Sequence, residues 1–335
     1  MYYWRFTDKI LEERLKTAPA LLIQGPKGCG KTETAMQHAS SIARMDTDTT
    51  IQYQMTLDPN LTLAGETPRL IDEWQTYPEI WNYVRHEVDR RKEKGQFILT
   101  GSSTAEDATV RHSGAGRFSI VTMRTMSSFE RGWSDGSISL YNALQGNEIK
   151  TDEVDFSLET LIEQLIIGGW PILLRDGIAQ GIQYSRDYID IIAGVEIKES
   201  SEQRQQPQKI LRLLRSYARN ISREASLKTL ALDTAGTDYS STSETISIYL
   251  ESLKRQFVIE DLPAWNTHIR SSHTLRKSPK RHFTDPSLAV GALQLSKEAL
   301  IADLQYTGLL FESMVIRDLR VYAQLYAGRV YHYRD

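Results

Sequence analysis

Residues 20–32 read Ala-Leu-Leu-Ile-Gln-Gly-Pro-Lys-Gly-Cys-Gly-Lys-Thr, a short apolar run that ends in a glycine-rich turn. The apolar run predicts a buried strand, and the apolar residues that follow at positions 35, 36, 39, 42 and 43 predict a helix over residues 31–43. A Gly-x-x-x-x-Gly-Lys-Thr pattern between a strand and a helix is typical of a loop that holds the phosphates of a nucleotide.

Each part of this loop has a predicted role. The glycines let successive backbone N–H groups converge on the phosphates, and the start of the following helix adds to the attraction. Lys31 is expected to reach the terminal phosphates, and Thr32 offers its hydroxyl to Mg²⁺. We therefore predict that ATP and Mg²⁺ bind to consecutive residues, which are Gly25, Pro26, Lys27, Gly28, Cys29, Gly30, Lys31, Thr32 and Glu33.

A second apolar stretch, Arg69-Leu-Ile-Asp72-Glu73, ends in two carboxylates about forty residues after the loop. We predict that Asp72 holds Mg²⁺ through water. Glu73 would orient or deprotonate the water that attacks the terminal phosphate, so it is a predicted catalytic residue together with Lys31. The alternative is a solvated strand end without a function.

Two further residues are candidates for the same site. Residues 97–103 (FILTGSS) form an apolar strand ending in small polar residues, and Ser102, with Thr100 and Ser103 beside it, is predicted to sense the terminal phosphate. A hydroxyl-rich turn is the alternative. Arg117 follows two glycines and is predicted to be an arginine finger, acting on its own site or on that of a neighbouring subunit. A structural salt bridge is the alternative.

The first part of the chain predicts an α/β fold. Strands are expected over residues 20–24, 51–57, 69–72, 97–100 and 118–123, with a helix over 79–94, which is typical of a parallel sheet covered on both faces. This core would occupy residues 1–135. Residues 136–204 are expected to form a helical lid or linker, with helices over 158–167 and 183–195.

Residues 205–290 show three helical patterns, with apolar positions at 210, 213, 214, 217 and 221 in the first helix. The second pattern covers residues 226–232 and the third lies around 241–254. Two expected strands, 257–262 and 281–284, follow and flank a basic stretch. This order predicts a winged helix-turn-helix. The remaining residues contain an expected helix over 308–326 and an alternating segment over 330–333.

Composition limits the partners of the chain. Its 335 residues exceed one ordinary core, and its net charge of -3 gives no general attraction for nucleic acid. Cys29 is the only cysteine, and there is no signal peptide or membrane-spanning run, so we expect a cytoplasmic protein without membrane contact.

Duplex DNA could still bind through the basic segment 270–282, with the helix around 241–254 entering a groove. A solvated face, or a protein partner of unknown identity, is the alternative. The basic residues of this segment are Arg270, Arg276, Lys277, Lys280 and Arg281.

Several motifs occur in an order that resembles a group of prokaryotic AAA-type ATPases, whose carboxyl-terminal half is a domain of unknown function. These motifs are Gly25-Pro-Lys-Gly-Cys-Gly-Lys-Thr, Leu70-Ile-Asp-Glu-Trp74, Leu99-Thr-Gly-Ser-Ser103, Gly114-Ala-Gly-Arg117, Arg124-Thr-Met-Ser-Ser-Phe-Glu130, Gly168-Gly-Trp-Pro171 and Thr284-Asp-Pro-Ser-Leu288. The resemblance implies an AAA+ core, a helical and winged-helix middle, and a final domain similar to restriction-endonuclease-like folds that starts in residues 291–335.

In that pattern Phe311 and Glu312 lie on the first helix of the nuclease-like domain, and residues 331–335 lead into it. The later acidic and Glu-x-Lys segments of the family are not in this sequence, so we expect no nuclease activity from this chain, which looks like a fragment of a longer protein.

The main hypothesis is an ATPase that couples its nucleotide state to a conformational change or to partner binding. The alternative is a slow ATP-dependent switch, or a DNA-associated regulatory module, with little hydrolysis. Salt-dependent binding to duplex DNA would separate these hypotheses. An arginine finger acting between subunits would require a homo-oligomer. A small-molecule kinase is disfavoured because about two hundred residues follow the core.

Overall fold

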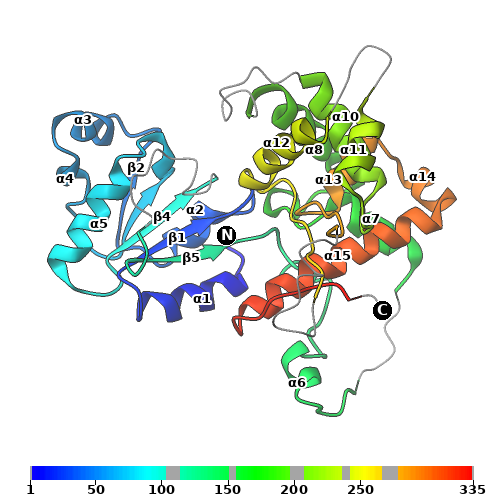
Figure 1. The fold of residues 1–335 in the computed structure, drawn as a ribbon. Coiled ribbons are helices and arrows are strands. Elements are labelled where there is room, and N and C mark those ends of the chain that lie inside the picture. Colours follow the sequence, from blue (N-terminus) through cyan, green and yellow to red (C-terminus); the bar gives the residue numbers. More distant parts are fainter. Residues whose placement is uncertain are drawn as a thin grey trace. The chain divides into compact units, whose positions relative to one another are not determined.

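The computed structural model describes residues 2–102, 114–150, 156–196, 207–235, 242–265 and 278–333 (Figure 1), without the side chains of residues 195 and 196. The chain divides into two compact units. Unit 1 contains Met1–Arg124 and Arg255–Phe257, and unit 2 contains Thr125–Lys254 and Val258–Asp335.

Unit 1 is built on a parallel sheet with the strand order β2-β3-β4-β1-β5. Since all these strands run in the same direction, their carboxyl ends lie along one edge of the sheet, where α/β folds bind their ligands. The predicted α/β fold is therefore confirmed. The strands are β1 (Ala20–Gln24), β2 (Ser41–Arg44), β3 (Arg69–Asp72), β4 (Phe97–Gly101) and β5 (Phe118–Thr122).

Helices cover both faces of this sheet (Figure 1). One face packs against α1 (Phe6–Leu15) and α2 (Lys31–Met36). The other face contributes Leu22, Ile71 and Leu99 to a core that also contains residues of α3 (Thr49–Leu57) and α5 (Ile80–Arg91). Two short helices, α4 (Pro59–Thr62) and the 3₁₀ turn η1 (Trp74–Thr76), complete the unit. Such double coverage explains why β1, β3 and β4 are buried along nearly their whole length.

Two predicted elements of unit 1 are wrong. The helix expected over residues 31–43 ends at Met36, and residues 41–44 form β2, because Ile42 and Ala43 pair with β3. Residues 51–57, expected as a strand, lie in α3. Asp48 caps this helix by accepting from the backbone N–H groups of Thr50 and Ile51, and burial of residues 51 and 55 gives the helix its apolar side.

Unit 2 is mainly helical. Its helices are α6 (Leu140–Leu144), α7 (Leu158–Ile167), α8 (Ile178–Ile191), α10 (Pro207–Arg219), α11 (Leu227–Thr234), α12 (Ser243–Arg255), α13 (Ser287–Leu293), α14 (Lys297–Ala302) and α15 (Leu304–Gln324). The 3₁₀ turn η2 (Pro171–Leu173) follows α7, and the π-helical turn η3 (Ile192–Glu196) follows α8.

One hydrophobic cluster in unit 2 runs from Ile162 to Met314. This cluster contains residues from three segments that we expected to be separate domains. These segments are 136–204, 205–290 and 291–335. The predicted boundary at 135 also differs from the observed division after Arg124. These segments share a core because α13 packs against both α8 and α10.

The helices of residues 207–255 follow the predicted pattern. All five apolar positions predicted for the first of these helices are fully buried: Ile210, Leu213, Leu214 and Tyr217 lie in α10, and Ile221 lies just after it. After α12, Ile259 bridges Phe283 and Leu262 bridges Lys280 in antiparallel fashion. Most of the basic segment, including Arg270, Arg276 and Lys277, lies outside the described residues.

The last predicted helix corresponds to α15, which packs Leu310 and Met314 into the core of unit 2. Phe311 and Glu312 lie on this helix, and the nuclease-like assignment stays a prediction. In the expected strand over residues 330–333, His332 bridges Ala264. No helix in the described part of the chain is long and apolar enough to cross a membrane.

Candidate functional site

The glycine-rich loop connects the carboxyl end of β1 to α2. Gly25 lies so close to the chain after β5 that a Cβ atom there would be 2.0 Å from the carbonyl oxygen of Met123. Gly30 is the N-cap of α2 and has a left-handed φ of 99°, a conformation that side chains other than glycine rarely adopt. The backbone of the loop therefore requires glycine at both ends.

Lys31 points back into this loop. Its side chain is buried, with 6% exposed, and Nζ donates to the carbonyl oxygens of Gly25 and Pro26, each at 2.9 Å. The ammonium group is thus held inside the turn by the loop itself. An anion entering the loop would find this cation already in position.

Asp72 joins three elements at the carboxyl edge of the sheet. Its Oδ1 accepts from the hydroxyl of Thr32 at 2.8 Å and from that of Thr100 at 2.5 Å. The carboxylate is 6% exposed. A carboxylate and a hydroxyl are hard oxygen donors of the kind that Mg²⁺ prefers, so the residues present here fit this metal. The predicted meeting of Thr32 and Asp72 is observed, and Thr100 is an additional partner.

Glu73 follows Asp72 directly and has a left-handed conformation, with φ 53° and ψ 47°. This conformation reverses the chain into η1. The Glu73 carboxylate then accepts a hydrogen bond from the side-chain amide of Gln75. Ser102 is buried and lies just beyond the carboxyl end of β4, the strand beside β3. Glu73 and Ser102 thus lie at the same edge as Asp72, and their roles stay predictions.

Arg117 lies at the edge of the sheet opposite to the glycine-rich loop of the same chain. It precedes β5, whose Phe118 pairs with Ala20 at the amino end of β1, whereas the loop follows the carboxyl end of β1. The 5 residues of β1 separate these ends by about 16 Å. Arg117 instead donates to Asp89 at 2.8 Å on the surface. The prediction of a finger acting on its own site is therefore wrong, and a role in a neighbouring subunit stays a prediction.

The other residues predicted to bind ATP differ in their exposure. Lys27 and Gly28 are exposed at the tip of the loop, and Glu33 is exposed in the first turn of α2. The Cys29 side chain is buried, with Sγ 3.7 Å from the carbonyl oxygen of Met123. Since its thiol is directed to Met123, Cys29 can contact a phosphate only through its backbone.

Arg5 is a residue of the site that sequence reasoning missed. It is 3% exposed, and its guanidinium donates to the carbonyl oxygen of Cys29 in the loop and to that of Arg124, both at 2.8 Å. Arg5 therefore ties the loop to the chain that leaves β5. Nothing in the residues around Arg5 indicates this role, because its partners are backbone groups 24 and 119 positions away.

A polar cluster continues from Arg5 along α1. Asp8 accepts from the backbone N–H of Arg5 and from the hydroxyl of Tyr2, and contacts the ring of His38 at 2.8 Å. The Tyr2 oxygen also lies 2.9 Å from the hydroxyl of Thr34 in α2, which can donate to it because the Tyr2 proton is directed to Asp8. Burial alone would raise the pKa of Asp8, but these hydrogen bonds outweigh burial and lower it. The cluster fixes α1 against the helix that follows the loop.

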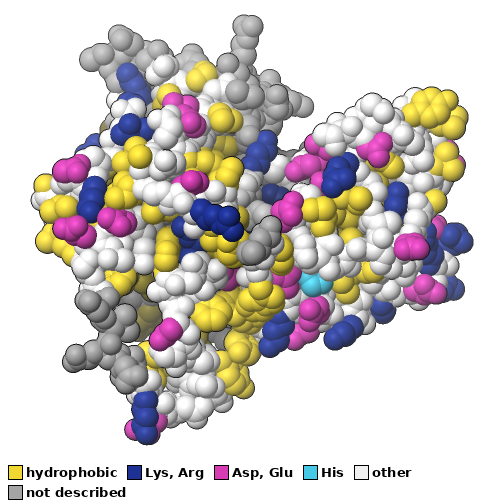
Figure 2. All heavy atoms as spheres, turned by 180° about the vertical axis from the view of Figure 1, so that it is seen from behind, with side chains coloured by type: hydrophobic (Ala, Val, Ile, Leu, Met, Phe, Trp, Pro, Cys, Tyr) yellow, Lys and Arg dark blue, Asp and Glu magenta, His cyan; other side chains and the backbone are white. Residues whose placement is uncertain are grey.

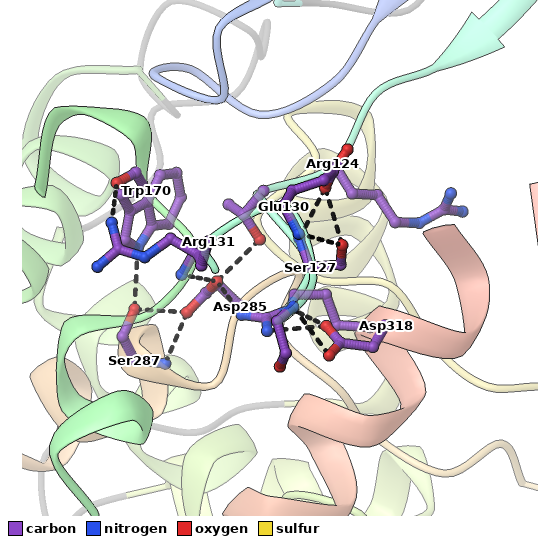
Figure 3. Close-up of polar contacts among 12 residues, drawn as sticks. Arg124, Ser127, Glu130, Arg131, Trp170, Asp285, Ser287 and Asp318 are labelled. Atoms are coloured by element: carbon purple, nitrogen blue, oxygen red, sulfur yellow. Dashed lines mark hydrogen bonds and ion pairs between the residues drawn. The ribbon is translucent and has the colours of Figure 1, made fainter. Parts of the chain in front are cut away.

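Unit 2 contains a second polar cluster, centred on the fully buried Asp285 (Figure 3). Its carboxylate accepts from the hydroxyl of Thr125 at 2.8 Å, from the backbone N–H of Gly169 at 2.9 Å and from the hydroxyl of Ser287 at 2.7 Å. The guanidinium of Arg317 on α15 completes the set at 3.0 Å. Three motifs that carry the family resemblance, 124–130, 168–171 and 284–288, meet here.

Arg317 lies between two carboxylates of this cluster, Asp285 and Asp318. Burial opposes ionisation, yet Arg317 and the surrounding hydrogen bonds lower the pKa of Asp285, while Asp318 and Asp285 raise that of Arg317. Asp318 also accepts from the backbone N–H of Ser128 (Figure 3). Because the groups of this cluster satisfy one another away from solvent, the arrangement supports structure rather than chemistry.

The described part of the basic segment is engaged within unit 2. Arg281 is 4% exposed and donates to Asp261 at 2.7 Å and to the carbonyl oxygen of Ala225. Lys280 pairs with Glu312 at 2.7 Å. The prediction that Arg281 contacts DNA phosphates is therefore wrong, because its guanidinium is buried in an internal ion pair. Figure 2 shows basic and acidic side chains interspersed on the visible face.

Two family models match the sequence. Residues 17–131 match the model described as an AAA domain. This match covers most of the first unit, which is therefore similar to AAA domains. Residues 158–299 match a model described as a domain of unknown function, DUF8612. No curated protein matches the chain.

Solved structures align with this chain at low sequence identity. A Walker-type ATPase of Pyrococcus abyssi aligns with a TM-score of 0.53 and 14% identity over 88% of this chain and 96% of that chain. AMPPCP-bound DnaA from Aquifex aeolicus aligns with a TM-score of 0.30 and 13% identity over 73% of this chain and 86% of that chain. At these identities the likeness concerns the fold alone, and the second alignment is too weak to support an argument.

Proposed function

We propose that this chain binds Mg-ATP at the glycine-rich loop and hydrolyses it to ADP and phosphate. The observation that carries the proposal is the contact of Thr32 with Asp72 at 2.8 Å, at the same sheet edge as Lys31. A hydroxyl from the start of α2 and a carboxylate from the end of β3 are brought together from positions 40 residues apart.

In the proposed mechanism, the loop binds the phosphates through its backbone N–H groups. Lys31 exchanges the carbonyl oxygens of Gly25 and Pro26 for phosphate oxygens, so little movement of its ammonium is needed. When bound, Mg²⁺ would supply positive charge that offsets the negative charge of the phosphates. Thr32 and Asp72 would hold it, with Thr100 orienting the Asp72 carboxylate.

Glu73 is proposed as the general base. The oxygen of a water attacks the terminal phosphorus, the bond from that phosphorus to the ADP oxygen breaks, and the proton of the water passes to the Glu73 carboxylate. Ser102 would contact the terminal phosphate from β4. A half-exposed carboxylate just beyond the end of β3 can receive both water and proton.

Turnover of the purified chain, compared with the Lys31→Ala and Glu73→Gln variants, tests this proposal. Lys31→Ala is expected to lose ATP binding. Glu73→Gln is expected to keep ATP while turnover falls about 100-fold or more, because a general base contributes about 10² to 10⁴. Gln52→Ala on α3, away from the loop, serves as a matched surface control. Unchanged turnover in Glu73→Gln would remove its assigned role, and binding without turnover in the wild type would favour the slow switch.

We further propose that nucleotide state reaches unit 2 through the chain that follows β5. Arg5 binds both the loop and Arg124, and the next residue, Thr125, is held by Asp285. A shift of the loop would therefore pull on a segment anchored in unit 2. This arrangement supports coupling of nucleotide state to a conformational change or to partner binding.

For residues 207–283 we propose a winged-helix module that binds a protein. The exposed side of α12 carries Glu244, Ile248 and Glu251, and Lys254 is paired with Glu251 and Asp261. An acidic and apolar helix face disfavours insertion beside DNA phosphates. Duplex DNA binding measured over a salt series tests this: affinity that falls steeply with salt would favour the DNA-associated module instead.

A further inference from the structure

The side chain of Gln75 has two ends with different surroundings. Its amide nitrogen donates to the Glu73 carboxylate, within the tight turn that the left-handed Glu73 begins. Its amide oxygen is buried and has no hydrogen-bond partner among the described residues. An unpaired buried oxygen costs free energy that an apolar side chain of the same length would avoid. The hydrogen bond from the amide nitrogen of Gln75 to Glu73 is therefore the reason we infer for a glutamine at this position.

Gly101, the last residue of β4, fixes the place of this amide. A Cβ atom on Gly101 would lie 2.5 Å from the amide oxygen of Gln75 and 2.8 Å from the indole nitrogen of Trp74. Gly101 is flanked by Thr100, which binds Asp72, and by Ser102. The Gln75 side chain therefore fits against the strand end that also orients the carboxylate of Asp72.

We propose that Gln75 is the positioning residue of the hydrolytic site. It holds one oxygen of the Glu73 carboxylate and leaves the other to accept a hydrogen bond from the attacking water. Because an amide is neutral, it fixes this direction without neutralising the carboxylate as an arginine or lysine would. The inference rests on the proposed role of Glu73 as general base.

The test compares ATP turnover and ATP affinity of the full chain with those of Gln75→Met. Methionine keeps the length and the packing of the side chain but lacks the donor. We expect kcat to fall about 10- to 100-fold, the scale of a misplaced catalytic group, with KM for ATP within about twofold of the wild type. Gln75→Glu should lower kcat at least as much, since two carboxylates would then repel each other.

Gly101→Ala perturbs the same contact without changing Gln75, because the new methyl group takes the space of the amide oxygen. It should reproduce the loss of kcat, and it keeps the test valid if Gln75→Met does not fold. Gln52→Met is the matched control: Gln52 donates to the carbonyl oxygen of Asp46 on the surface, and its replacement should leave kcat unchanged.

Glu73→Gln separates failure of this inference from failure of the proposed function. If Glu73→Gln abolishes turnover while folded Gln75→Met and Gly101→Ala keep the wild-type kcat, Glu73 remains the base and the positioning role of Gln75 is overturned. A rise in KM alone would also overturn it, because Gln75 would then act in binding. If Glu73→Gln turns over normally, the base assignment fails and the inference falls with it.

Discussion

At the scale of single residues, the site depends on short contacts that fix the direction of one polar group. The Asp72 carboxylate is oriented because Thr32 and Thr100 both donate to its Oδ1, which leaves Oδ2 for other partners. The Lys31 ammonium is oriented because it donates to two carbonyl oxygens of its own loop. The sequence motifs predicted that Thr32 and Asp72 serve one metal site, but not that Thr100 donates to Asp72. The sequence also did not reveal Gln75 or Arg5, because neither an amide beside a glutamate nor an arginine that binds distant backbone carbonyls forms a recognisable motif.

A buried histidine in unit 2 predicts a pH dependence of stability. His282 is 1% exposed, with Nδ1 3.1 Å from the Ser313 hydroxyl, and burial together with Arg320 and Lys280 lowers its pKa to about 3. In the unfolded chain an ordinary histidine binds its proton near pH 6.5. The unfolded state thus binds more protons between these values, and stability falls as pH drops below about 6.5.

Urea unfolding at pH 7.5 and pH 5.5, for the wild type and His282→Gln, measures this effect. The wild type should lose about 1.4 kcal/mol more than the variant over this interval, which corresponds to one proton bound near pH 6.5 in the unfolded chain. The difference between the two proteins removes the contributions of the other titrating groups. Equal losses in both proteins would show that His282 is protonated without cost in the folded state.

At the scale of elements, tertiary contacts decided whether a segment forms a helix or a strand where the local sequence pattern did not. Residues 42 and 43 continue the apolar spacing of α2, yet they pair with β3, because a strand at the sheet edge satisfies its backbone and buries Ala43. Residues 51–57 contain threonine, isoleucine and tyrosine, which favour strands. They form α3 because Asp48 caps the helix and because Ile51 and Met55 bury its apolar side.

The close approach of the loop to the end of β5 predicts that Gly25→Ala disrupts the site. The new Cβ would lie 2.0 Å from a backbone oxygen of Met123, so the loop must move. We expect ATP affinity to fall at least about 10-fold, measured by titration with a fluorescent ATP analogue. Gly308→Ala is the matched control, because nothing lies within 4 Å of a Cβ at Gly308 in α15. Wild-type affinity in Gly25→Ala would mean that the loop binds no phosphate in this geometry.

At the scale of the whole molecule, each unit is held by a polar cluster that joins distant parts of the chain. In unit 1, Arg5 and Asp8 connect the first helix to the loop and to the end of β5. In unit 2, Asp285 connects Thr125, Gly169 and Arg317, which lie up to 160 residues away. Coupling between nucleotide and unit 2 would pass along the covalent chain between these clusters.

Asp285→Asn is therefore expected to destabilise unit 2 strongly. Removing one partner of a buried ion pair leaves the other charge uncompensated, at a cost of about 3–5 kcal/mol, although Asp318 still contacts Arg317. Urea unfolding followed by circular dichroism measures the loss. Asp89→Asn breaks an exposed pair with Arg117 and should leave the unfolding midpoint unchanged. Equal midpoints for both variants would contradict the structural role of the Asp285 cluster.

The sequence by itself determined the α/β class of the first unit, four of its five strands, the glycine-rich loop and the carboxylates at the end of β3, because strand and loop signals are local. It also placed the motifs 124–130, 168–171 and 284–288 in order. Only the tertiary structure decided that these motifs converge on Asp285, that Arg117 lies at the edge opposite the loop, and that Arg281 is buried. Contacts between residues far apart in sequence depend on how elements pack, and packing is a property of the whole fold.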